Sequence, residues 1–358
     1  MSEDNQQYWH TIEHKTKNAR VKDAQTQERE MSKYVLEGAA AEKVIVSDTW
    51  MIRLAPIFGG IILLCGILLF FTGHWLMGIG SLALGAVDFF FVFDRVRHRA
   101  RTAKYSIVHQ VIEPYFKPEI YLAYKKLPED VIREADICDE WDSALMSDYF
   151  LGNWKGVPFE FGDLTLKGKP VGGDQVQSLF MGQLYIIETG LNLTTPISIR
   201  ERLEPLSQEV YEGRKNSERF FLTGNVQFDR QFDVRLGNSH CVNGFEDGVE
   251  GRSVEEIRKE AHDLVDELAA DIIEADEYAV SRTSMRFAGN RLYLAIENTR
   301  DSFEFKRGDE KNIAMMRQRF EEEIKDMTLY LDLITRGLER IKAKAQSVTS
   351  EGNEEVKE

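Results

Sequence analysis

Two long apolar runs near the N-terminus constrain this chain more than any other feature. The first run covers residues 54–72 and the second covers residues 75–93, with only Gly73 and His74 between them. As a helix, each run would extend about 1.5 Å per residue and reach roughly 28 Å, close to the thickness of the hydrocarbon core of a bilayer. The sequence therefore predicts a two-helix transmembrane hairpin within residues 49–94.

The charges that flank the hairpin predict its orientation. The connecting turn contains no Lys or Arg, whereas four arginines follow the second run: Arg95, Arg97, Arg99 and Arg101. Cytoplasmic flanks carry an excess of such residues, so both termini are predicted to be cytoplasmic. Trp50 and Trp75 are predicted, with these arginines, to anchor the hairpin at the membrane interfaces, where indole rings are favoured.

Small residues recur along one face of each predicted helix and suggest close packing within the hairpin or between copies. The candidate packing positions are Gly59, Gly66, Gly78, Ser81, Gly85 and Asp88. Asp88 is the one ionisable residue well inside either run. It is interpreted as a tolerated carboxylate near the cytoplasmic end, with a role in an oligomeric pore as the alternative.

The remaining chain divides into three parts by composition. Residues 1–48 are polar and predict a helical or disordered arm, and residues 346–358 predict a disordered acidic tail. Residues 95–345 predict a cytoplasmic domain. The formal net charge of −15 argues against nucleic-acid binding. The three cysteines, Cys65, Cys138 and Cys241, are too scattered for a disulfide framework or a cysteine-based zinc site.

Hydrophobic periodicity within residues 95–345 predicts mixed helices and strands. Residues 105–150 are predicted to be mainly helical, and alternating apolar residues predict four strands, over residues 157–166, 176–188, 191–199 and 219–234. Ser253 and Glu256 form a capping box before an amphipathic helix. Because strands and helices do not alternate regularly, we predict an α+β fold with a mixed or antiparallel sheet.

Two further elements are predicted near the C-terminal end of the domain. Residues 284–287 and 292–297 flank the turn sequence AGNR and predict a β-hairpin. Apolar residues between Met316 and Ile341 recur at spacings of three and four, which predicts a long helix. That helix could pack along its own domain or form a coiled coil with a second copy.

No sequence motif nominates an active site. His10 to His14 match the zinc pattern H-x-x-E-H, but the pattern lies in the charged arm, where no apolar surroundings would fix a third ligand. Ser239, His240 and Cys241 are adjacent, whereas a nucleophile and its base usually come from separate segments. We therefore predict no metal and no cofactor, and favour a protein that is not an enzyme.

The order of several strand and turn motifs resembles a known family. These are GNWKGVPFEFGDLTL at 152–166, SLFMGQLYIIET at 178–189, FDRQFDVR at 228–235 and MRFAGNRLYLAIENTRDSFEF at 285–305. Together they resemble, over roughly residues 50–335, a family of bacterial membrane proteins catalogued as a domain of unknown function and associated with LemA-like membrane proteins. The segment GNSHCVNGFEDGVEG, from residue 237, departs from the family pattern. The resemblance transfers no catalytic residues.

The leading functional hypothesis is a membrane-anchored interaction module, a scaffold or sensor at the membrane surface. The resemblance implies the bacterial inner membrane as its location and a LemA-like protein as a partner, beside membrane lipid. One alternative is a membrane-bound hydrolase or transferase whose site is dispersed in the sequence. A second alternative is a small oligomeric pore built on the packing face of the hairpin, which requires a homo-oligomer.

Overall fold

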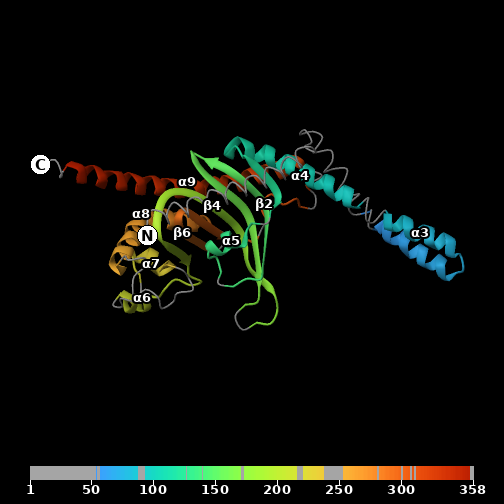
Figure 1. Cartoon of the computed structure of the whole chain (residues 1–358), viewed down its shortest axis with the longest axis horizontal. Coiled ribbons are helices and arrows are strands. Elements are labelled where there is room, and N and C mark those ends of the chain that lie inside the picture. Colours follow the sequence, from blue (N-terminus) through green and yellow to red (C-terminus); the bar gives the residue numbers. More distant parts are fainter. Residues whose placement is uncertain are drawn as a thin grey trace, which may run out of the picture.

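The computed structural model describes residues 54, 57–87, 93–125, 127–138, 140–170, 173–215, 221–237, 253–279, 282–299, 301–306, 309 and 312–354. Residues 57–71 are helical, and a short turn joins them to α3 (Trp75–Val87). The next helix, α4 (Phe93–Phe116), enters the α+β domain. Figure 1 shows the helical hairpin at the far end of α4, away from the sheet.

The predicted transmembrane hairpin is wrong. Among the described residues, no helix combines the length and the apolarity that crossing a bilayer requires. The multi-pass inner-membrane location that rested on two crossings is wrong for the same reason.

The domain contains a six-stranded antiparallel sheet, so the α+β prediction is confirmed. The strands are β1 (Ile120–Lys125), β2 (Ser143–Trp154), β3 (Val157–Gly168), β4 (Gln177–Glu201), β5 (Phe232–Leu236) and β6 (Thr283–Glu297). Strands β1 to β4 pair in sequence order. β3 pairs with the first part of β4, and β5 pairs with the last residues of β4. β6 pairs with β4 along nearly the whole length of β6.

Helices cover the sheet unequally (Figure 1). α4, α8 (Val254–Tyr278) and α9 (Ile313–Glu354) contribute to the larger core, together with Tyr185 and Ile187 of β4. The smaller core contains Leu184 and Ile186, the alternate residues of the same strand, and residues of α5 (Glu129–Glu134). The strict alternation along β4 thus explains how one central strand serves two cores.

The long C-terminal helix packs along its own domain, as the first of the two interpretations predicts. Its periodic apolar residues are buried: Met316, Phe320, Ile324, Met327, Leu331, Ile334 and Leu338. Gly337 permits a close approach to α8, because a Cβ atom there would lie 2.4 Å from Leu268 Cδ2. α9 continues to Glu354, into the segment for which a disordered tail is predicted.

Three local predictions within the domain are wrong. Residues 105–150 contain β1 and most of β2 as well as helices. Much of the strand predicted over 219–234 is instead α7 (Val226–Gln231), which leads into β5. The AGNR sequence is not a hairpin turn, because the residues before and after it both pair with β4 as one continuous strand.

Candidate functional site

The two helices of the hairpin pack together at glycines, and Leu63 packs against Gly85. Gly66, Gly78 and Gly85 are all buried. A Cβ atom on Gly66 would lie 2.9 Å from the backbone nitrogen of Leu82, and one on Gly78 would lie 2.9 Å from the carbonyl oxygen of Gly66. The two helices therefore touch backbone to backbone, as small residues permit.

The large apolar side chains of the hairpin face outward. Phe71 is 82% exposed and Leu76 is 68% exposed. Others with about half or more of their surface exposed are Ile57, Phe58, Ile61, Leu64, Leu68, Phe70, Trp75, Met77, Ile79, Leu84 and Val87. A helix that is apolar all round is normally surrounded by protein or by lipid. This hairpin therefore presents a surface that requires apolar surroundings.

The other predicted residues of this region fall in several places. Gly59 is buried, Ser81 is half-buried, and Trp75 begins α3 with 55% of its surface exposed. The four arginines predicted as anchors lie in the first turns of α4. Trp50 and Asp88 lie outside the described residues, as do the arm at 1–48 and the Ser239 to Cys241 sequence.

Beyond the hairpin, the middle of α4 contacts a buried polar cluster on the sheet. Lys104 Nζ of α4 donates a hydrogen bond of 2.7 Å to Asp148 Oδ2. The other Asp148 oxygen accepts a 2.5 Å hydrogen bond from the Tyr121 hydroxyl. Asp163 lies beside this group and accepts hydrogen bonds from the backbone nitrogen and hydroxyl of Ser302. The cluster therefore ties α4 to β1, β2, β3 and the segment that follows β6.

Asp148 combines a left-handed backbone conformation with a raised side-chain pKa. It has a φ of 48° where the β2–β3 register shifts between Ser147 and Phe150. Burial raises its pKa to about 6, although the Lys104 ammonium acts in the opposite direction. Burial also raises the pKa of Asp163, and the neighbouring carboxylates of Asp148 and Asp301 add to that rise.

The three carboxylates could in principle offer oxygen ligands to a cation, because oxygen atoms of Asp148, Asp163 and Asp301 lie within 4.8 Å of one another. Their surroundings fit a different arrangement. Both oxygens of Asp148 and both of Asp163 already accept hydrogen bonds from protein groups. Since Lys104 supplies a positive charge there, the cluster is built as an internal ion-pair and hydrogen-bond network rather than as a metal centre.

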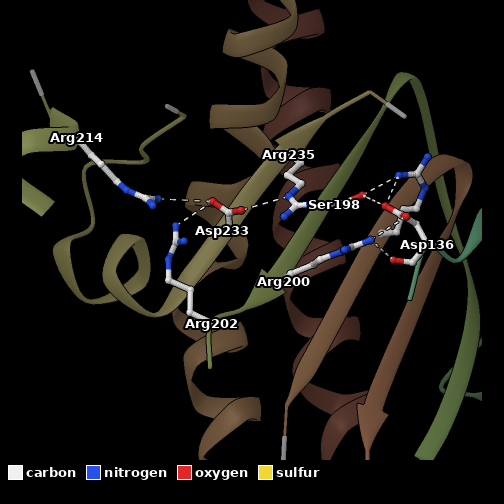
Figure 2. A network of polar contacts seen from close by, with 8 residues as sticks. Asp136, Ser198, Arg200, Arg202, Arg214, Asp233 and Arg235 are labelled. Carbon is white, nitrogen blue, oxygen red and sulfur yellow. Dashed lines mark hydrogen bonds and ion pairs between the residues drawn. The ribbon is translucent and has the colours of Figure 1, made fainter. Parts of the chain in front are cut away.

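A second polar network lies on the opposite side of the sheet from α8 and α9 (Figure 2). Arg286 of β6 donates 2.7 Å to the Ser198 hydroxyl of β4, and it pairs with Asp136 at 3.2 Å. Arg200 of β4 pairs with the same carboxylate at 2.8 Å. Because Ser198 and Arg200 alternate with buried Ile199, they project together from one face of the strand.

The contacts on the left of Figure 2 are centred on the carboxylate of Asp233 in β5. Asp233 accepts hydrogen bonds from Arg202 at 2.9 Å and from Arg235 at 3.2 Å, and Arg214 of α6 (Gln208–Lys215) approaches it to 3.9 Å. Together these contacts involve the turn after α5, helix α6 and the strands β4, β5 and β6. Their chemistry is that of buried and half-buried ion pairs, which fix the relative positions of elements.

A separate groove of about 560 Å³ lies where the bend of β4 meets α8 and α9. Its apolar residues are Leu191, Leu193, Leu264 and Ile341. Four carboxylate side chains of α8 line it at helical spacings, Glu256, Glu260, Asp263 and Glu267, beside Lys259 and Lys344. The groove thus combines an apolar lining with an excess of negative charge.

Sequence reasoning did not nominate the groove or either polar network. Asp148, Asp163 and Asp301 come from β2, β3 and the segment after β6, so no spacing along the chain brings them together. The available signals were weak: Asp148 is the one charged residue of β2, and Arg286 lies between the apolar Met285 and Phe287. Dispersed side chains of this kind become a cluster only through strand register.

Comparison with known proteins adds little to this picture. No known family model matches the chain, and no curated protein matches it. Among solved structures, the crystal structure of the mycobacterial trehalose monomycolate transport factor A, TtfA, is similar over 61% of this chain and 90% of that chain. The identity is 10% and the TM-score 0.29, a likeness too distant to carry an argument about fold or function.

Proposed function

We propose that this chain is an interaction module that attaches to a lipid surface through its helical hairpin, without crossing the bilayer, and presents the α+β domain beside it. The observation that carries the proposal is the outward direction of the apolar side chains between residues 57 and 87, around a contact made by glycines. Removing apolar area of this extent from water is favourable and lowers the free energy by about 25 cal/mol per Å².

Lipid suits this surface better than a groove in a protein does. The exposed apolar residues surround both helices rather than forming one stripe, so a partner that covered a single face would leave the rest in water. A hairpin that enters the hydrocarbon from one side of the bilayer meets lipid around both of its helices. The basic residues at the start of α4 would then lie beside the headgroups, where positive charge is favoured.

Vesicle flotation tests this proposal with the full chain. We expect the chain to float with vesicles of phosphatidylcholine and phosphatidylglycerol, and the quadruple variant Phe58→Ser, Leu64→Ser, Phe71→Ser and Leu76→Ser to remain at the bottom of the gradient. A matched control replaces four exposed apolar residues of the domain: Leu145, Val176, Leu203 and Met315, each by Ser. Flotation that is absent in the wild type, or unchanged in the hairpin variant, would contradict the proposal.

A labelling experiment tests whether the hairpin crosses the bilayer. His74→Cys places a thiol in the turn of a chain whose other cysteines are replaced by Ser. We expect a membrane-impermeant maleimide to leave this thiol unlabelled from the vesicle side opposite the domain. Labelling from that side would show a crossing and would contradict this part of the proposal.

A protein partner, such as a LemA-like membrane protein, is a further proposal that rests on the family resemblance alone. Crosslinking in cells followed by mass spectrometry should recover such a partner above background, and recovery of none would count against it. Among the described residues, no specific contact favours the hydrolase or transferase alternative, since Asp148 and Asp163 are buried and already hydrogen-bonded.

A further inference from the structure

The groove between β4, α8 and α9 has the properties of a peptide-binding surface. Its floor is made by leucine and isoleucine side chains, and four carboxylates of α8 outnumber the two lysines that also line it. Lys344 is already paired with Glu267 at 2.9 Å. A ligand that matches this surface must bring apolar side chains together with positive charge.

The chain itself contains a segment of that chemistry. Residues 8–22 read YWHTIEHKTKNARVK, in which Tyr8, Trp9 and Ile12 precede the basic residues Lys15, Lys17, Arg20 and Lys22. Four basic residues stand against one acidic residue, Glu13, in a chain whose net charge is −15. Aromatic side chains supply much apolar area at low entropic cost, which suits them to a shallow groove.

We propose that residues 8–22 bind in this groove of the same molecule, with Trp9 and Ile12 against the apolar floor and the basic residues against the carboxylates of α8. The proposal is independent of lipid attachment.

The chain is long enough for this contact. Residues 23–53 can extend by at most about 3.3 Å each, or roughly 100 Å in total. The path from the start of the hairpin to the groove follows α4, about 36 Å long, and then α9 from Met316 to Ile341, about 38 Å. The sum of about 75 Å lies within the reach of the intervening residues, so the contact can form within one molecule.

Disulfide trapping tests the proposed contact in the full chain, with Cys65, Cys138 and Cys241 replaced by Ser. We expect Ile12→Cys and Leu193→Cys to form an intramolecular disulfide under mild oxidation at least tenfold faster than the control pair Ile12→Cys and Leu145→Cys. Leu145 is 58% exposed on β2, outside the groove. Equal rates for the two pairs would overturn the proposal. A disulfide formed only between two chains would also overturn it, in favour of a second copy as the occupant.

A charge exchange provides a second test that does not depend on one cysteine pair. Lys15→Glu with Lys17→Glu should slow the trapping about tenfold, and adding Glu260→Lys with Asp263→Lys should restore it. Circular dichroism confirms that each variant is folded. A failure of the reversed charges to slow the trapping would overturn the electrostatic part of the proposal. Competition by excess synthetic peptide of residues 8–22 is expected, and its absence would count against binding in the groove.

Discussion

The helical hairpin and the α+β domain contain the same types of large apolar side chain, which face solvent in the hairpin and the interior in the domain. In the domain, large side chains such as Phe150 and Phe287 are fully buried among the other apolar residues of the larger core. In the hairpin, glycines form the interior, while Phe71 and Leu76 face outward. Apolar content alone therefore does not specify a core, because the surroundings of each segment decide which way its large residues point.

The largest expected effect tests this contrast with one residue type. Phe320→Ala should lower the free energy of unfolding by about 3–5 kcal/mol, because the fully buried ring packs against Phe303 and Phe305. Phe71→Ala, at a ring that is 82% exposed, should change it by less than about 0.5 kcal/mol. Urea denaturation measures both. Similar losses in the two variants would break the contrast.

The buried carboxylates of the domain give a pH dependence that the exposed surface does not. Burial raises the pKa of Asp148 from 3.8 to about 6, so between these values the folded chain holds a proton that the unfolded chain has lost. The contribution of Asp148 to the free energy of unfolding therefore falls as the pH rises from about 4 to about 6, by up to about 3 kcal/mol.

Asp148→Asn should remove this contribution, because Asn tolerates the positive φ and can still accept the Tyr121 hydrogen bond. Denaturation curves at several pH values between 4 and 7 measure the change in slope. Asp332→Asn, at an exposed ion pair with Lys155, is the matched control. An unchanged slope in the Asp148 variant would contradict the assignment.

The glycine contact can be tested within the hairpin itself. Gly66→Ala should separate the helices, since the added methyl group would lie 2.9 Å from a backbone nitrogen, and the cost of such crowding is about 1–3 kcal/mol. Gly60→Ala meets no atom within 4 Å and should leave the contact intact. Hydrogen exchange over residues 57–87 in lipid measures both. Equal protection in the two variants would show that the contact does not hold the hairpin.

The smallest expected effect concerns the start of α8. Ser253→Ala removes the side chain that accepts from the backbone nitrogen of Glu256 and should cost about 1 kcal/mol of domain stability. Ser253→Asp retains the cap and is the matched control. A thermal midpoint that is the same for all three chains would show that the cap contributes nothing.

Local signals in the sequence predicted those parts of the domain whose structure is decided locally. The capping box at Ser253 marks the observed start of α8, and the spacing of Met316, Phe320 and Ile324 marks the buried face of α9. The two strands predicted over 176–188 and 191–199 are one bent strand, β4, because β6 pairs across the bend. The prediction of two strands failed because it ignored pairing between segments that are distant in sequence, which residue patterns along the chain do not reveal.

The hairpin and the candidate sites were less predictable for a related reason. The glycine spacing suggested packing within the hairpin or between copies, and Gly66, Gly78 and Gly85 are buried between the two helices. Among the described residues, however, no helix is both long and apolar enough to cross a bilayer. The cluster at Asp148 depends on Lys104 from α4 and on Ser302, two residues that are distant in sequence from each other. Its existence follows from the register of the sheet and not from any local motif.

The pairing of β4 with β6 has a consequence for the synthesis of this protein. Thr189 of β4 and the Asn290 carbonyl of β6 form a hydrogen bond across 101 positions of sequence. At a translation rate of about 5–20 residues per second, the ribosome needs roughly 5–20 s to supply β6 after β4 has been made. During this interval the edge of β4 that β6 will occupy has no partner, and an unpaired strand edge is a template for pairing with another chain.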